Sequence, residues 1–204
     1  MLGRVPAPPT RPALRDRYDR RQQQLVRDAA RVFAARGYDQ TSIQDLAEAT
    51  GLAAGGLYHY IGSKERLLMA ICDQLMEPLL AAARELLRAE APAGEQLRAL
   101  VRLWVAHVVD HRDHMLVFQQ ERHVIERGAQ WRAVRSSRKR FERLVEDVLA
   151  AVEGTGDAGF ADRRLALSAL LGMVNHTAQW YRPRGRLSPR EVADGYVDLL
   201  LRSA

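Results

Sequence analysis

The sequence predicts an all-α protein, in which an amino-terminal three-helix domain is joined by a long helix to a larger helical body. Three observations support this fold class. Apolar residues recur at helical spacing in every segment after residue 16. No segment alternates apolar and polar residues as a strand would, and joints rich in glycine and proline separate the apolar runs. With 204 residues, the chain is long enough to bury a core without disulfides.

The first fifteen residues predict a basic arm. They contain prolines at positions 6, 8, 9 and 12 and arginines at positions 4, 11 and 15. This composition is typical of disorder, so residues 1–15 are expected to be a disordered arm. The first helix should begin near Asp16 to Asp19 and end at Gly37, because glycine suits the residue after a helix.

Two short helices and the start of a longer one follow. Thr41 with Gln44 three residues later has the pattern of a capping box for a second helix, which Gly51 should end. Residues 53–60 can form a third short helix. Ser63 can then cap a long fourth helix.

The rest of the chain is predicted as helices separated by breakers. The last of them has a strong start signal, because Ser188, Pro189 and Glu191 combine a cap, a proline at the first helical position and a glutamate at the third. Pro78 should kink the fourth helix. The helices are expected over residues 64–89, 93–111, 113–126, 129–153, 162–181 and 189–202. The expected units are the arm 1–15, a domain 16–62 and a body 63–204.

The composition is basic, with a formal net charge of +6. Arginine supplies most of that charge and only Lys64 and Lys139 are lysines, so composition alone is weak evidence for a nucleic-acid partner. The single cysteine, Cys72, excludes an intramolecular disulfide and indicates a structural thiol. The sequence has neither a signal-peptide pattern nor a run of about 18 apolar residues, so a cytoplasmic protein is expected.

The segment Thr41 to Leu67 has the parts of a helix-turn-helix: a capped helix, a tight turn with glycine, and a slender second helix that can enter the major groove. It reads TSIQDLAEATGLAAGGLYHYIGSKERL. Leu46, Leu57 and Ile61 should face the small core of this domain. The outward positions are then Gln44, Ala54, Gly55, Gly56, Tyr58, His59 and Tyr60.

This segment resembles the TetR family of bacterial repressors, whose motif it matches continuously. The resemblance implies that Tyr58 and His59 contact phosphates or thymine methyl groups, and that Tyr60 and Lys64 contact phosphates. Exposed N–H groups and the helix dipole at the helix starts favour phosphate independently. The expected DNA-binding residues are Thr41, Ser42, Gln44, Ala54, Gly55, Gly56, Tyr58, His59, Tyr60 and Lys64.

The second helix of this motif, the recognition helix, differs from the family in one respect. Family members often carry lysine, arginine or glutamine where this chain has Ala53-Ala54-Gly55-Gly56. No long side chain is therefore available to read guanine directly. Sequence specificity should depend on Gln44, thymine methyl contacts, DNA shape and the arm.

The last two predicted helices suit a dimer interface. Helix 162–181 is apolar around most of its circumference and must be covered on two sides. The resemblance implies that it forms a four-helix bundle with helix 189–202 and their partner copies, as a palindromic operator requires of a two-fold protein. The expected interface residues are Leu170, Val174, Val192, Tyr196, Leu199 and Leu200.

The carboxy-terminal segment is similar to a TetR subgroup that controls the catabolism of fatty-acid and steroid acyl-CoA thioesters. Such a ligand needs an apolar cavity and cations for three phosphates. The expected cavity residues are Trp104, Val108, Met115, Phe118, Phe141, Met173 and Trp180, and the expected phosphate ligands are Arg135, Arg138, Lys139 and Arg182. A solvated arginine face over 132–143 is an equally good interpretation.

The function expected from these observations is a dimeric repressor that binds a palindromic operator and is released by a small effector, with an acyl-CoA as the expected effector. A multidrug sensor controlling an efflux gene is the alternative within the family. His107, His111 and His114 could lie on one helix face, so a helical metal-binding protein is the alternative from another class. The chain has no catalytic motif, and neither an enzyme nor a cofactor is expected.

Overall fold

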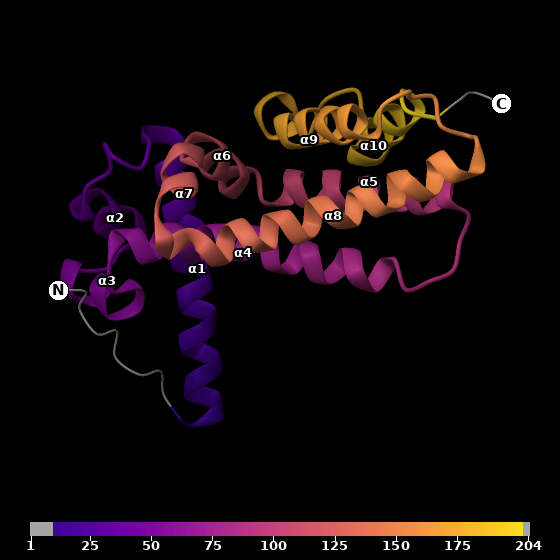
Figure 1. The fold of residues 1–204 in the computed structure, drawn as a ribbon. Coiled ribbons are helices and arrows are strands. Elements are labelled where there is room, and N and C mark those ends of the chain that lie inside the picture. Colours follow the sequence, from indigo (N-terminus) through magenta and orange to yellow (C-terminus); the bar gives the residue numbers. More distant parts are fainter. Residues whose placement is uncertain (1–9, 202–204) are drawn as a thin grey trace.

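A computed structural model describes residues 10–201, and this part of the chain forms the all-α fold that the sequence predicts (Figure 1). An amino-terminal unit of three helices contacts a body in which long helices lie side by side. The helices are α1 (Pro12–Arg36), α2 (Ile43–Thr50), α3 (Ala54–Ile61), α4 (Lys64–Leu86), α5 (Ala93–Asp110), α6 (Arg112–Gln120), α7 (Arg122–Arg127), α8 (Arg132–Thr155), α9 (Arg163–Trp180) and α10 (Pro189–Asp198). Residues 129–131 add one 3-10 turn.

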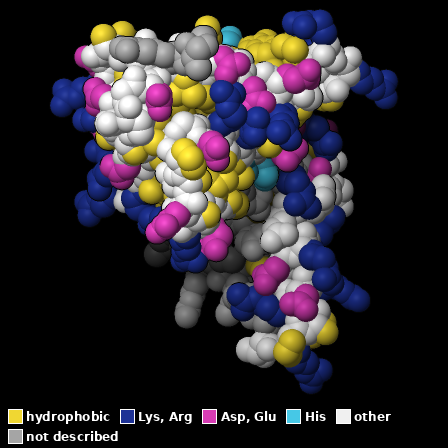
Figure 2. Space-filling view, turned by 90° about the vertical axis from the view of Figure 1, so that its right-hand side faces the viewer, with side chains coloured by type: hydrophobic (Ala, Val, Ile, Leu, Met, Phe, Trp, Pro, Cys, Tyr) yellow, Lys and Arg dark blue, Asp and Glu magenta, His cyan; other side chains and the backbone are white. Residues whose placement is uncertain are grey.

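The first helix begins earlier than predicted. It starts at Pro12 because proline at a first helical position has its φ already set and lacks an N–H that would be unsatisfied there. The part of the predicted arm before residue 10 lies outside the described residues. Tyr18 is the first buried side chain of α1, so the start of the helix protrudes from the molecule, surrounded by arginines (Figure 2).

Local signals placed many helix ends correctly, but the last helix, predicted over 189–202, ends at Asp198, and there are two further differences. The capping box of α2 is formed by Ser42 and Asp45, one residue after the predicted pair, because Asp45 returns the hydrogen bond. The predicted helix 113–126 is divided into α6 and α7 at Glu121. Helix α4 continues through Pro78 without interruption.

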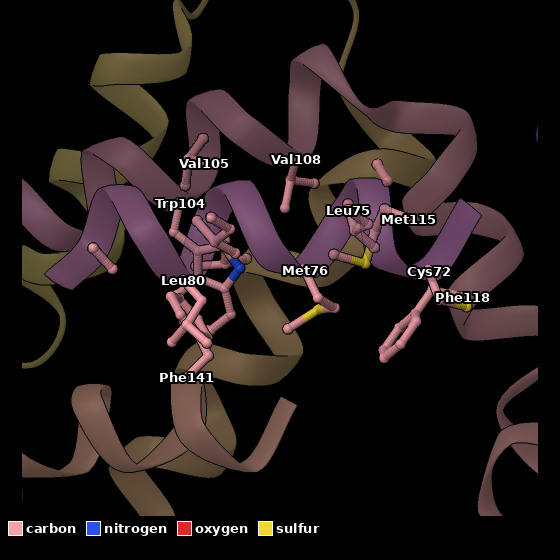
Figure 3. Close-up of a cluster of buried hydrophobic side chains, with 14 of the residues drawn as sticks. Cys72, Leu75, Met76, Leu80, Trp104, Val105, Val108, Met115, Phe118 and Phe141 are labelled. Atoms are coloured by element: carbon pink, nitrogen blue, oxygen red, sulfur yellow. The ribbon is translucent and has the colours of Figure 1, made fainter. Parts of the chain in front are cut away.

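One hydrophobic core runs from the amino-terminal unit into the body. Within it, an aromatic contact joins α5 to α8, where the Trp104 and Phe141 rings lie edge to face with centroids 4.9 Å apart (Figure 3). Cys72 is fully buried in this core, and burial raises the pKa of its thiol. Helix α6 packs on α1 and on α4, so the body and the amino-terminal unit share an extensive contact.

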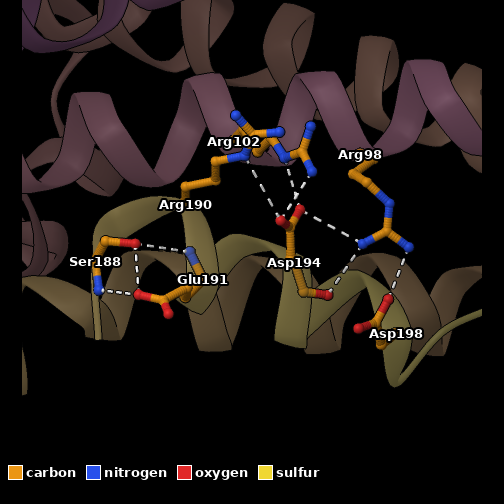
Figure 4. Close-up of polar contacts among 7 residues, drawn as sticks. All are labelled: Arg98, Arg102, Ser188, Arg190, Glu191, Asp194 and Asp198. Atoms are coloured by element: carbon orange, nitrogen blue, oxygen red, sulfur yellow. Dashed lines mark hydrogen bonds and ion pairs between the residues drawn. The ribbon is translucent and has the colours of Figure 1, made fainter. Parts of the chain in front are cut away.

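Ion pairs fix α10 on α5. The Asp194 carboxylate accepts hydrogen bonds from Arg102 at 2.6 and 2.8 Å, and Arg98 donates to Asp198 at 2.7 Å (Figure 4). The Arg102 and Arg98 guanidinium groups lower the pKa of Asp194. Ser188 and Glu191 form the capping box that the sequence predicts.

Among residues 10–201, no helix is both long and apolar enough to cross a membrane.

Candidate DNA-binding surface and ligand cavity

The two short helices of the amino-terminal unit are positioned by their ends. Ser42 Oγ accepts from the Asp45 N–H at 3.1 Å, and the Asp45 carboxylate accepts from the Ser42 N–H at 2.7 Å. The Ser42 hydroxyl also donates to the Asp45 carboxylate at 2.7 Å, and this bond, the bond from the Ser42 N–H and the nearby Arg36 lower the pKa of Asp45. Gly51 then adopts φ 66°, a left-handed conformation that favours glycine, and turns the chain into α3.

Most of the predicted DNA-binding residues share an accessible surface. Within residues 10–201, and apart from the neighbouring backbone of α3 itself, nothing lies within 4 Å of a Cβ built at Gly55 or Gly56, so packing in this part of the chain does not require glycine there. Two helical glycines without a packing reason cost about 1 kcal/mol each in helix propensity. The exposed residues are Ser42, Gln44, Ala54, Gly55, Tyr58 and His59, and the partly buried ones are Gly56, Tyr60 and Lys64.

The structure corrects the predicted role of Thr41 as a DNA-binding residue. Its side chain is buried and its hydroxyl donates to the Gly37 carbonyl at 2.7 Å, so the hydroxyl closes the turn before α2 and does not face the accessible surface. The sequence motif did not distinguish this role from a phosphate contact. Tyr60 is held in place by its ring, which stacks on Tyr18 with centroids 4.9 Å apart.

Lys64 lies where the turn before α2 meets the start of α4. Its ammonium group is 3.4 Å from the Asp39 carbonyl and 4.4 Å from the centroid of the Tyr38 ring. Ser63 caps α4 by accepting from the Arg66 N–H at 3.1 Å. A cation beside a helix start is a suitable site for phosphate.

The body contains a cavity of about 600 Å³. It is lined by residues from α4, α5, α6, α7, α8 and α9, and Met76, Phe118 and Phe141 point towards the same open space (Figure 3). The predicted residues that line it are Trp104, Met115, Phe118, Arg138 and Phe141. The lining residues that sequence reasoning missed are Met76, Leu79, Gln119, Arg122, Glu142, Ser168, Leu171, Gly172, Asn175, His176 and Gln179.

Six predicted ligand residues lie outside this cavity. Arg135 donates to the Ile125 and Gly128 carbonyls at 2.7 and 2.8 Å and so closes the turn between α7 and α8. Val108 is fully buried in the core and does not line the cavity. The others are Met173, which is partly buried against the core, and the exposed Lys139, Trp180 and Arg182.

Two arginines line the cavity, Arg122 and Arg138, and Arg138 is neutralised. Arg138 pairs with Glu126 at 2.6 Å and with Glu142 at 3.3 Å, and the bond from Arg138 lowers the pKa of Glu126. Opposite, on α9, Asn175 Oδ1 is buried and lacks a hydrogen-bond partner within the described residues. The cavity therefore has an apolar side and a polar side. On the polar side, the charge of Arg138 is balanced by two carboxylates.

The predicted dimer residues are mostly internal, which is a second correction. Four of them are buried within the protomer, because α9 packs on α5 and α8 and because α10 packs on α5 and α9. These four are Leu170, Val174, Val192 and Leu200. Tyr196 is partly buried and its hydroxyl is 3.0 Å from that of Thr177. Of the predicted set only Leu199 is largely exposed.

Three large apolar side chains in and directly after the last two helices are exposed. Leu199, directly after α10, is 72% exposed, Leu165 of α9 is 70% exposed and Trp180 of α9 is 42% exposed. Helical periodicity alone could not decide which face of α9 is covered by its own chain.

The three histidines are engaged within the body. His107 Nε2 is 2.7 Å from the Leu75 carbonyl, His111 Nδ1 is 3.1 Å from the His107 carbonyl, and His114 Nε2 is 3.3 Å from Gln74 Oε1. Within residues 10–201 there is no group of three or more histidine, cysteine or acidic side chains arranged to hold a metal ion. The histidine set therefore does not support the metal-binding alternative.

Comparison with known families matches both parts of the chain. Residues 25–71 match the family model described as bacterial regulatory proteins, tetR family. Residues 90–204 match a model described as tetracyclin repressor-like, C-terminal domain.

Individual proteins are similar over almost the full length. The chain is 27% identical over 203 residues to the HTH-type transcriptional repressor KstR2 of Mycolicibacterium smegmatis, covering 97% of this chain and 94% of that protein. The TetR family transcriptional regulator PfmR of Thermus thermophilus is 31% identical, with a TM-score of 0.75 and coverage of 86% and 96%. AibR, solved in complex with isovaleryl coenzyme A and operator DNA, is 28% identical, with a TM-score of 0.76 and coverage of 88% and 97%.

Proposed function

The chain belongs to the TetR family of bacterial regulators, and on that premise we propose that it is a dimeric transcriptional repressor released from its operator by a small effector. The observation that carries the proposal is the pairing of an accessible helix-turn-helix with a separate cavity of about 600 Å³ within one continuous core. Two sites joined by packed helices are what an effector-controlled DNA-binding protein requires.

We propose that the DNA surface consists of α3, the start of α2 and the start of α4. Tyr58 and His59 would contact the DNA from α3, and Lys64 would neutralise a phosphate. The bare backbone at Gly55 and Gly56 would allow α3 to approach the DNA closely, with no long side chain to read a guanine.

We propose that the effector is an acyl-CoA thioester. The relatives support this class, because AibR was solved with isovaleryl coenzyme A and the similar KstR2 of Mycobacterium tuberculosis is described as a ketosteroid transcriptional regulator. The apolar wall around Trp104 and Phe141 suits an acyl group. A lipophilic cation is less well matched, because the cavity carboxylate Glu142 pairs with Arg138 and Glu121 does not line the cavity.

The dimer proposed here uses the exposed apolar face that contains Leu165, Trp180 and Leu199. A two-fold repressor buries such a face against its partner copy. Leu199 is common to this face and the predicted set, whereas Leu165 and Trp180 replace the predicted residues that are buried within the protomer.

Release of DNA by thioesters tests the proposal. Purified protein would be titrated onto fluorescent DNA from its own upstream region, and a panel of short, long and polycyclic acyl-CoAs would be added beside the free acids and free CoA. Only a thioester fills the cavity and also presents phosphates, so only thioesters should release the DNA. Release by free acids or lipophilic cations and by no thioester would overturn the acyl-CoA assignment and favour the drug-sensor alternative.

A further inference from the structure

A groove adjoins the ligand cavity. It has a volume of about 380 Å³ and lies between α6 and α9. Its lining residues are Arg112, Leu116, Gln119, Gln120 and Gln179. Gln119 and Gln179 also line the larger cavity, so these two side chains are the boundary between the two hollows.

The boundary is closed by one hydrogen bond. Gln179 Nε2 on α9 donates to Gln119 Oε1 on α6 at 3.0 Å. Both partners are neutral amides on an exposed edge, so water or a ligand amide can replace either of them at little cost. A bond of this kind can open without leaving a buried polar group unsatisfied.

The two hollows differ in chemistry. The cavity presents aromatic and aliphatic side chains such as Trp104 and Phe141, its Arg138 is paired with two carboxylates, and its second arginine, Arg122, lies 3.6 Å from Glu126. The groove is lined by three glutamines, one leucine and Arg112. Arg112 is 46% exposed and is 3.5 Å from the carboxylate of its neighbour Asp113, a longer and more exposed pair than those of Arg138.

We propose that the cavity and the groove are two compartments of a single ligand channel, and that Gln119 and Gln179 are the gate between them. The acyl group occupies the cavity, an amide of the thioester's polar chain replaces the bond between the two glutamines, and the phosphates lie in the groove at Arg112. This assignment rests on the proposed acyl-CoA function and names Arg112, which the sequence did not suggest, as the phosphate ligand in place of Arg138.

Two thioesters that differ only beyond the gate test this arrangement. Decanoyl-CoA has the acyl group, the amide chain and the phosphates, whereas decanoyl-N-acetylcysteamine ends after the first amide. Binding of each to the intact protein would be measured by calorimetry for the unchanged chain and for Arg112→Ala, Gln179→Leu and Arg88→Ala. Arg88 is the matched control, because it is an exposed arginine paired with a nearby acid, Glu85, at the far end of α4.

Each variant has a distinct expected result. Arg112→Ala should raise the Kd of decanoyl-CoA about tenfold, the worth of one charged hydrogen bond, and leave decanoyl-N-acetylcysteamine within about twofold. Gln179→Leu should weaken both thioesters by a similar factor, because both place an amide at the gate. Arg88→Ala should change neither Kd.

The outcomes separate the two levels of the proposal. If no thioester binds the unchanged chain, the acyl-CoA function fails and the channel with it. If decanoyl-CoA binds and Arg112→Ala leaves its Kd unchanged, or weakens both thioesters equally, the channel assignment alone is wrong. Circular dichroism melting shows whether each variant is folded. Because the substituted side chains are exposed, all three variants should fold.

Discussion

Glu121 Oε1 accepts a hydrogen bond from the Tyr38 backbone N–H at 3.2 Å, which joins the end of α6 to the turn before α2. On the same end of α6, Gln120 donates to the Ala34 carbonyl of α1 at 3.4 Å. Helix α6 also places Met115 and Phe118 in the cavity. A ligand that shifts α6 therefore acts directly on the segment that leads into the DNA-binding helices.

Glu121→Ala should uncouple the effector from the DNA. The variant should bind ligand and operator about as the unchanged chain does, while saturating effector should lower its operator affinity several-fold less, because the connection at Tyr38 is gone. Operator Kd with and without effector measures this. Glu121→Gln, which keeps the acceptor oxygen, should retain the coupling, and full coupling in the alanine variant would assign the transmission elsewhere.

Lys64→Ala should weaken binding to all DNA sequences about equally. It removes one proposed phosphate contact, so the slope of log K against log salt should decrease by roughly one unit with little change in specificity. Anisotropy titrations across salt concentrations provide both quantities. Lys139→Ala on α8, which removes the only other lysine, should leave the slope unchanged. An unaltered slope in Lys64→Ala would remove this residue from the interface.

Deletion of residues 1–15 should leave the fold intact and reduce DNA affinity at low salt. The deletion shortens α1, but Tyr18 is its first buried side chain, so the core is retained. The loss of three arginines should weaken nonspecific attraction to phosphate. A melting temperature lower by more than roughly 5 °C would show that the segment packs, and equal binding at every salt concentration would show that it is not used.

Leu199→Arg should dissociate the proposed dimer. A charge on the exposed apolar face would have to be buried against the partner copy, which is strongly unfavourable. Light scattering should report a monomer, and operator affinity should fall with it. Leu14→Arg is the matched control for the molecular mass measured by light scattering. It makes the same substitution at another exposed leucine, which lies on α1. A Leu199→Arg protein that stays dimeric would place the interface on another surface.

The free energy of unfolding should decrease as the pH falls from 7 to 5. Burial, together with His111, Arg27 and His107, lowers the pKa of His114 to about 4, below its ordinary value of 6.5. The folded state therefore binds this proton less readily than the unfolded state, and the stability present above pH 6.5 is lost towards pH 4. His114 alone should contribute about 2 kcal/mol over this interval.

Urea unfolding at several pH values measures that loss. His114→Gln should flatten the dependence, whereas His59→Gln, at an exposed position on α3, should not. The carboxylates whose pKa is lowered, including Asp194 and Glu126, titrate below this interval. An unchanged slope in His114→Gln would show that the histidine is not the cause.

Signals that depend on a few neighbouring residues were readable from the sequence. The caps at Ser63 and Ser188 and the glycine end at Gly51 depend only on local backbone chemistry, and each was placed correctly. The capping box forms at Ser42 and not at the predicted Thr41, because Asp45, and not Gln44, supplies the returning bond.

Features that depend on how helices pack were not readable. Helix α9 is apolar on several sides, so its periodicity could not show that Leu170 and Val174 face their own core while Leu165 is exposed. Trp180 was assigned to the cavity for the same reason. Polar lining residues such as Asn175 carry no sequence signal, because only the positions of other helices bring them to a cavity wall.

The burial of Cys72 has a practical consequence. Because it is the only cysteine and its thiol is both enclosed and hard to ionise, the chain needs no cysteine removal before labelling. A cysteine introduced at the exposed end of α3 would therefore be the one site that takes a spin label in each protomer. Pulsed electron resonance could then follow the separation of the two labels, which should match one turn of DNA, about 34–36 Å between half-site centres, in the operator-bound dimer and change when the effector binds.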